Sequence, residues 1–300
     1  MDIYISGKKT NIKNTKLNRF LLGGLIVKRD AKTLYLAEKN IVNINAWINP
    51  DRTVNNVDDY LSIVVVDYLC KQNGIELVDS TLETKHLYAV GSILLGWQDS
   101  VIWGSGFISK EHSKKTLFLS SLHRILHKTD VRAVRGPISL GILKDMRIVK
   151  PDRNDIKFGD PAILLPLIYP KKPSHKKRFL VIPHYSKLDN YKKYDCISTF
   201  CSNYRAFIDR VLEYDLIISS SLHGLILAES YGIPAVMLMD TPMKDITKYK
   251  DWYYSTNRYQ FPVANTVEEA IKIVPSRINM SVLTSMQKDL IDCFPRDIWK

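Results

Sequence analysis

Segments of strand and helix character alternate through the second half of the chain, and this alternation constrains the fold more than any other feature. Three apolar runs, at 178–182, 216–218 and 234–239, have the length and composition of buried strands. Between them lie two segments of helical character, 204–214 and 223–231. This order is typical of a parallel sheet that is wound with helices on both faces. The pattern therefore predicts an α/β fold.

The first half shows the same character less regularly, and a basic segment separates the two halves. Residues 166–178 hold three prolines and five basic residues, a composition typical of a linker. We expect two doubly wound, Rossmann-like domains that face each other across a cleft. The expected parts are an N-terminal α/β domain at 1–168, a basic linker at 169–177, a C-terminal α/β domain at 178–275 and a helical segment at 276–300.

The chain of 300 residues carries a formal net charge of +12. Such an excess favours anionic partners, although many solvated lysines would produce the same figure. The densest basic cluster, within 171–178, is interrupted by Pro173 and has no interleaved aromatic residues, so a nucleic-acid platform is not expected. The four cysteines lack C-x-x-C spacing, and no histidine cluster accompanies them, so no metal site is expected.

No apolar run reaches the ~20 residues that a membrane-spanning helix needs. The run at 20–27 is ended by Lys28, and no small-residue cleavage site follows it, so we interpret it as a buried element. Few cysteines in a large chain suit a reducing cytosol. We expect a cytoplasmic protein, with peripheral contact at an anionic inner membrane face as an alternative.

The stretch SSSLHG, residues 219–224, lies between a predicted strand and a predicted helix. Ligands of open α/β sheets bind at such junctions, where backbone N–H groups of the first helical turn attract anions. Ser219, Ser220 and Ser221 would add hydroxyl donors, and Gly224 would let a ligand approach the backbone. The helix dipole would keep His223 neutral until a bound phosphate favoured its protonation. The alternative is that Ser221 is only a helix N-cap and that His223 has local partners.

A series of short stretches resembles the polysaccharide pyruvyltransferase family, in the order in which that family has them. They are NVDDYLS (56–62), GSIL (91–94), VIWGSGF (101–107), VRGP (134–137), FGDPAIL (158–164), IPHY (182–185), SSSLHG with GIP (219–234) and KYKDWY (248–253). The closest similarity is to the subgroup with an SSSLHG motif. Asp58 stands where the family usually has glycine, and Ser221 stands where several members have arginine.

The resemblance implies a two-domain architecture like that of GT-B glycosyltransferases. It implies transfer of the enolpyruvyl carbons of phosphoenolpyruvate to two hydroxyls of a glycan sugar, which forms a pyruvate ketal and releases phosphate. This reaction belongs to the biosynthesis of cell-surface glycans such as exopolysaccharide and lipopolysaccharide. The implied partners are phosphoenolpyruvate and a saccharide acceptor, either lipid-linked or polymeric. No metal and no cofactor beyond the donor substrate is expected.

The same resemblance suggests roles for particular residues. His223 would protonate the enol carbon or hold the phosphate, and Arg135 would clamp the carboxylate or phosphate of the donor. Further expected substrate-binding residues are Ser219, Ser220, Ser221, Gly224, Gly104, Ser105, Gly106, His184, Tyr185, Lys248 and its rival Lys244. Two other functions stay open: a GT-B-type glycosyltransferase that uses a nucleotide sugar, and a non-catalytic anion-binding protein.

Overall fold

A computed structural model of the chain describes residues 42–44, 55–75, 85–94, 99–110, 128–201, 203–240 and 246–299. Three features of the sequence lie outside these ranges: the apolar run at 20–27, a helix expected at 117–126, and Lys244. Within the described ranges, no helix combines the length and the apolar character that crossing a membrane requires.

The first sheet is parallel and has five strands in the order β1-β3-β4-β5-β6. These strands are β1 (Val42–Ile44), β3 (Lys85–Tyr88), β4 (Ser100–Trp103), β5 (Thr129–Val134) and β6 (Lys157–Phe158). All residues of β4 are buried, because a parallel sheet is covered on both faces. Helix α5 (Pro137–Asp145) follows β5 and has a proline in its first turn, where proline is favoured.

The second sheet is also parallel and has the order β11-β10-β9-β7. Its strands are β7 (Lys177–Ile182), β9 (Tyr214–Ser219), β10 (Ala235–Leu238) and β11 (Val263–Ala264). Helices α7 (Tyr204–Val211) and α8 (Leu222–Ser230) connect its first three strands in sequence. Ile182 lies opposite Ser219, so β7 and β9 end at the same edge. The predicted alternation of strands and helices is confirmed.

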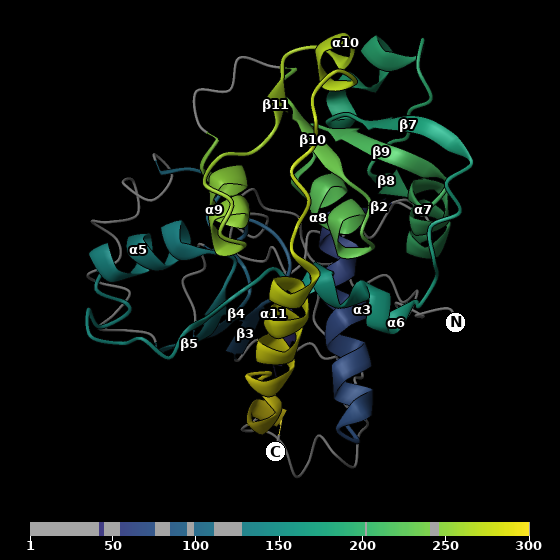
Figure 1. Cartoon of the computed structure of the whole chain (residues 1–300). Helices are drawn as coiled ribbons and strands as arrows, with labels where there is room; N and C mark the ends of the chain where they lie inside the picture. The colour runs from purple at the N-terminus through teal and green to yellow at the C-terminus, as the bar shows by residue number, and fades with distance from the viewer. Residues whose placement is uncertain are drawn as a thin grey trace, which may run out of the picture.

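A short antiparallel ribbon joins the two halves of the chain. Strand β2 (Asn55–Asn56) pairs with β8 (Phe200–Cys201), and Val57 donates a backbone hydrogen bond to the carbonyl of Thr199 at 2.7 Å. Helix α3 (Val57–Gln72) begins directly after β2 and packs against α7, α6 (Leu165–Ile168) and the 3-10 helix η1 (Pro161–Leu164). In Figure 1, α3 begins near the second sheet and extends away from it toward the lower end of the view.

The C-terminal part of the chain returns to the first sheet. Helix α11 (Met280–Asp292) packs against β6 and η1, and Trp103 donates its indole N–H to the carbonyl of Leu290 at 2.9 Å. Helix α9 (Thr247–Ser255) packs against α5. The remaining elements are η2 (Tyr185–Tyr191), α10 (Val267–Ala270) and η3 (Arg296–Trp299). One continuous apolar core contains residues of both sheets, such as Ala133 and Ile217. The α/β class is confirmed, whereas the domain boundaries and the GT-B arrangement stay predictions.

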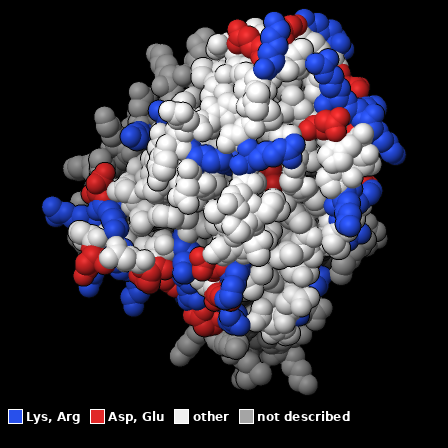
Figure 2. All heavy atoms as spheres, viewed as in Figure 1, with Lys and Arg blue, Asp and Glu red and all other residues white. Residues whose placement is uncertain are grey.

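The positive charge of the protein is spread over its surface. On the face that Figure 2 shows, basic side chains lie in several separate groups, with acidic side chains beside many of them. Two lysines of the basic segment take part in ion pairs, Lys171 with Asp209 at 2.7 Å and Lys177 with Asp195 at 3.4 Å. Exposed pairs of this kind stabilise the fold little, but they reduce the field that a polyanion would meet.

Candidate functional site

The three serines after β9 build the turn that starts α8. Ser221 is the N-cap, and its hydroxyl accepts a hydrogen bond from the Gly224 amide at 3.3 Å. The Ser219 hydroxyl donates to the carbonyls of Ile182 and Ser221, and the Ser220 hydroxyl donates to Asp240 at 3.1 Å. The Ser219 and Ser220 hydroxyls therefore hold the junction in place, and their expected role as donors to a ligand stays a prediction.

The glycines that were expected to admit a ligand are packed against protein atoms. A Cβ at Gly224 would lie 2.4 Å from the Ser219 hydroxyl oxygen, and one at Gly104 would lie 2.3 Å from the Pro161 ring. Gly104 also has a φ of +96°, a left-handed conformation that glycine adopts readily. Close packing, and not an approaching ligand, requires glycine at both positions.

In the loop at 104–106, the backbone amides of Gly104 and Gly106 donate to carbonyls of the protein and are not directed toward a ligand. The Gly104 amide donates to the Ala133 carbonyl at 2.9 Å, and the Gly106 amide donates to the Gly91 carbonyl at 3.0 Å. Ser105 is fully buried, and its hydroxyl donates to the same Gly91 carbonyl at 2.8 Å. These polar groups join neighbouring loops of the first sheet, and the expected substrate-binding role of the loop stays a prediction.

His223 lies in the first turn of α8, buried between two carboxylates from the first half of the chain. Its Nε2 is 3.2 Å from Asp160 Oδ2, and its Nδ1 is 3.1 Å from Asp58 Oδ2. Asp160 is fully buried and caps η1, since its other oxygen accepts a hydrogen bond from the Ala162 amide at 3.0 Å. Asp58 lies in the first turn of α3. Three elements that are distant in sequence therefore converge on one imidazole.

Asp58 and Asp160 together favour a protonated His223 in the empty site, whereas the sequence suggested a neutral one. Burial alone would lower the pKa of His223, but Asp58 and Asp160 outweigh it and raise that pKa to about 10. Burial would raise the pKa of Asp58, yet His223 and then Lys248 lower it. The expectation of a neutral histidine is wrong, because two nearby carboxylates stabilise the imidazolium more than a helix dipole opposes it.

The two imidazole nitrogens differ in geometry. Nε2 and Asp160 are aligned as a hydrogen bond, which fixes the ring. Nδ1 is close enough to Asp58 for an ion pair, but it has no aligned hydrogen-bond partner, and neither has Asp58 Oδ1. Buried polar atoms in native structures rarely stay unpaired. Nδ1 is therefore the less constrained of the two nitrogens.

We expect Asp58→Asn to lower the pKa of His223 by about 1–3 pH units, because the substitution removes one of its two anionic neighbours. The pKa of His223 in the folded protein lies above its value of 6.5 in the unfolded chain, so protonation of His223 stabilises the fold. This stabilisation is fully present below pH 6.5 and is lost as pH rises through about 10. In Asp58→Asn the loss should be complete at a lower pH than in the wild type.

Imidazole chemical shifts, followed by NMR across this pH range, measure the effect. The matched control is Asp67→Asn, which changes the same charge on the same helix at a surface pair with Lys71. An unchanged His223 pKa in Asp58→Asn would show that Asp160 alone holds the proton.

Lys248 supplies a cation near Asp58. It is half-buried on α9, and its Nζ lies 4.9 Å from the centre of the Tyr249 ring. Burial lowers the pKa of Lys248, Asp58 opposes this effect, and the charge of Arg135 adds to it. Among the residues that the structure describes, its ammonium makes no ion pair. An anionic substrate would therefore provide a partner that the described part of the chain does not supply at this position.

Arg135 is fully buried and bound to protein groups. Its Nε lies 3.2 Å from Asp251 Oδ2, while its terminal nitrogens donate to the Ser92 hydroxyl and the Phe107 carbonyl, both at 2.6 Å. Gly106 leaves room for this guanidinium, because a Cβ there would lie 2.5 Å from it. A donor substrate would reach Arg135 only by displacing one of these contacts, so its expected role as a clamp has no support in this geometry.

His184 and Tyr185 lie at the end of β7, on the same edge as Ser220. The His184 amide donates to the Ser220 hydroxyl at 2.7 Å. Partial burial and the charge of Lys248 lower the pKa of His184, while Asp240 and Asp58 oppose them. His184 is therefore close enough to Lys248 and Asp58 to experience their charges, and the Tyr185 ring remains half-exposed.

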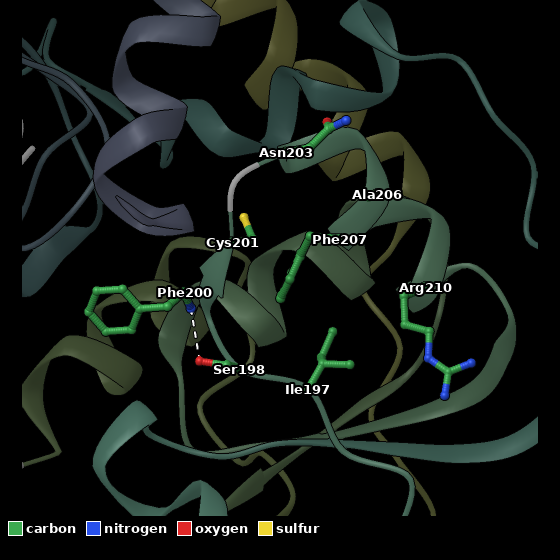
Figure 3. Close-up of a pocket in the computed structure, with 8 residues that line it drawn as sticks. All are labelled: Ile197, Ser198, Phe200, Cys201, Asn203, Ala206, Phe207 and Arg210. Atoms are coloured by element: carbon green, nitrogen blue, oxygen red, sulfur yellow. Dashed lines mark hydrogen bonds between the residues drawn. The ribbon is translucent and has the colours of Figure 1, made fainter. Parts of the chain in front are cut away.

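A separate pocket of about 390 Å³ lies between β8 and α7. Figure 3 shows its lining, which includes Cys201, Phe207 and Arg210 but none of the residues around His223. Arg210 is already paired with Glu213 at 2.7 Å and with Asp195 at 3.4 Å. This pocket is therefore not the anion site. Nor do three or more side chains suited to hold a metal ion gather anywhere in the described ranges.

Sequence reasoning found His223 and Lys248 but missed the role of both carboxylates. Asp160 lay within the quoted FGDPAIL stretch, and Asp58 was the departure from glycine in NVDDYLS. The sequence offered one signal for their role. It has a histidine at a predicted helix start and two acidic residues near the starts of other predicted elements. The sequence contained no information on which acidic residue would reach His223.

Comparison with known proteins places these observations in a family. The chain is 28% identical, over half of its length, to "Uncharacterized protein L143" of Acanthamoeba polyphaga mimivirus, and it spans about half the length of that relative. A crystal structure of the functionally uncharacterised protein KP1_0663 from Klebsiella pneumoniae covers 78% of this chain and 97% of its own, with 15% identity and a TM-score of 0.47. The family model for polysaccharide pyruvyl transferase matches residues 86–240, just over half of the chain. The chain therefore belongs to the polysaccharide pyruvyl transferase family.

Proposed function

We propose that the protein transfers the enolpyruvyl carbons of phosphoenolpyruvate to two hydroxyls of a glycan sugar and thereby forms a pyruvate ketal. The observation that carries this proposal is the buried His223 imidazole between two carboxylates, together with the Lys248 ammonium, which makes no ion pair among the described residues. Enol protonation requires a proton donor, and the donor substrate requires a cation. His223 and Lys248 would provide these two functions, and the charges of both act on Asp58.

The proposed reaction begins with proton transfer from His223 Nδ1 to C3 of the enol. The resulting oxocarbenium at C2 is attacked by the first sugar hydroxyl, whose proton returns to His223. The C–O bond to phosphate then breaks, and the second hydroxyl attacks C2 and gives its proton to the departing phosphate. Asp160 keeps the ring in place throughout, and Asp58 stabilises the imidazolium. A positioned general acid of this kind contributes about 10²–10⁴-fold to the rate.

Donor binding falls to Lys248 and the first turn of α8. A phosphate close to the lysine would raise its pKa again and keep it charged. Arg135 acts behind the site as a positioning residue, because it ties α9, which carries Lys248, to the loops of the first sheet. Its charge also contributes to the lowered pKa of Lys248.

The finer features belong to the same proposal. We place the reaction in cell-surface polysaccharide biosynthesis, in the cytoplasm, with a lipid-linked or polymeric acceptor and peripheral membrane contact if the acceptor is lipid-linked. The donor substrate needs no metal or cofactor in this scheme. The two sheets would form the facing halves of a GT-B-like architecture. Membership of the family favours pyruvyl transfer over the nucleotide-sugar alternative.

The test supplies phosphoenolpyruvate and a saccharide fraction from cells of the source organism that lack this gene. We expect release of inorganic phosphate, and a ketal methyl signal in the proton NMR spectrum of the product. Phosphate release and methyl signal should appear in equal amounts, because each transfer produces one of each. Release of a nucleoside diphosphate from nucleotide sugars, with phosphoenolpyruvate untouched, would show that the proposal is wrong.

A further inference from the structure

Tyr185 presents a supported aromatic ring to solvent at the end of β7. Its side chain is 51% exposed, which is high for a large aromatic residue beside a buried site. The His184 ring lies 4.3 Å from it, and the Phe200 ring meets it edge-on at 4.9 Å with an interplanar angle of 86°. Two aromatic contacts therefore hold the ring in one orientation while part of it remains open.

This ring lies close to the groups proposed to act on the donor. His184 is bound to Ser220, which directly precedes the N-cap of α8. Phe200 pairs with Asn56 in the β2–β8 ribbon, two residues before Asp58. Tyr185 is therefore linked through His184 and Ser220 to the start of α8, which carries His223. It is linked through Phe200 and Asn56 to the start of α3, which carries Asp58.

Polar groups of both kinds lie near His184, the residue that packs on this ring. Ser186 occupies His184 Nδ1, with its hydroxyl at 2.8 Å and its amide at 3.4 Å. When Nδ1 accepts from these two groups, the neutral imidazole carries its hydrogen on Nε2 as a donor. Asp240 contributes a carboxylate, held by the Ser220 hydroxyl at 3.1 Å. A flat apolar face with one donor and one acceptor beside it suits a pyranose, whose C–H groups pack on the ring while its hydroxyls form hydrogen bonds.

We propose that Tyr185 is the platform on which the acceptor sugar stacks, with His184 Nε2 and Asp240 as partners of its hydroxyls. The proposal rests on the proposed function, since it assigns the acceptor to one side of the site and the anionic donor to Lys248 on the other. The pocket behind β8 is a separate feature. Phe200 lines that pocket and His184 and Tyr185 do not, and in Figure 3 the Phe200 ring extends away from the side chains of Phe207 and Arg210.

The experiment measures sugar binding and donor binding separately on the full chain. Saturation-transfer difference NMR with methyl glycosides of glucose, galactose, mannose, N-acetylglucosamine and N-acetylmannosamine reports which sugar protons contact protein. The variants are Tyr185→Ala and Tyr185→Phe. The control is Tyr259→Ala, which removes another exposed tyrosine, one that contacts Tyr254. Titration with phosphoenolpyruvate measures donor affinity in each variant.

We expect signals from the C–H protons of at least one glycoside in the wild type, in Tyr185→Phe and in Tyr259→Ala. Tyr185→Ala should weaken that sugar about tenfold, the change that ~1.4 kcal/mol produces, and leave donor affinity unchanged. Equal sugar binding by Tyr185→Ala and the wild type, or no binding of any glycoside by the wild type, would overturn the platform. Failure to bind phosphoenolpyruvate would instead count against the proposed function.

Discussion

His223→Gln should lower the rate of phosphate release from phosphoenolpyruvate with acceptor by about 10²–10⁴-fold. Glutamine has nearly the length of histidine and can donate one hydrogen bond to Asp160, but it carries no transferable proton. The binding of phosphoenolpyruvate should weaken less than turnover, because Lys248 stays in place. The rate of phosphate release and the donor affinity, measured side by side, separate the loss of the acid from the loss of the site.

Two further variants distinguish the loss of proton transfer from a loss of folding. His223→Lys keeps a cation between the two carboxylates and so preserves their charge balance, while it removes the imidazole that is placed to protonate the enol carbon. His175→Gln makes the same substitution at an exposed histidine that is paired with Asp215 at 2.9 Å, and it should leave turnover unchanged. Phosphate release within tenfold of wild type by a folded His223→Gln would assign the proton transfer to another group.

The position of His223 could be predicted from the sequence, but its charge state could not. Local signals sufficed for the position, since an apolar strand, three serines and a helix start are contiguous in the chain. The charge state depends on Asp58 and Asp160, which come from other elements and reach His223 only through tertiary packing. A dipole effect of about 0.3–1 kcal/mol was the only term visible in the sequence, and the unseen ion pairs are stronger.

The same distinction applies to the fold. Strands β7, β9 and β10 were predictable because each is a short apolar run between turn signals. The helix in the C-terminal segment was also predictable from its pattern. Its docking against β6 and η1 was not, since an amphipathic pattern shows that a face is buried and not which surface buries it. The need for glycine at 104 and 224 also depends on packing that the sequence pattern does not show. The atoms that exclude a side chain at these positions belong to Pro161 and Ser219.

Arg135→Ala should lower the free energy of unfolding by about 3–5 kcal/mol, because it leaves the fully buried Asp251 without its charge partner. The Asp251 carboxylate would keep the amides of Ile138 and Ser139 as donors, which places the effect toward the lower end of that range. Turnover should fall together with stability, since the α5–α9 contact that positions Lys248 is weakened. Urea unfolding measures the first effect, and phosphate release measures the second.

A substitution at the neighbouring arginine and a paired substitution make this prediction specific. Arg132→Ala removes an exposed pair with Asp130 and Asp297 and should change stability by no more than ~1 kcal/mol. Replacing Arg135 with Met together with Asp251 with Leu removes both buried charges, and it should recover part of the stability lost in Arg135→Ala. If Arg135→Ala instead unfolds at the wild-type urea concentration and no longer binds phosphoenolpyruvate, Arg135 is an anion clamp and the buried contacts described above must open when the donor binds.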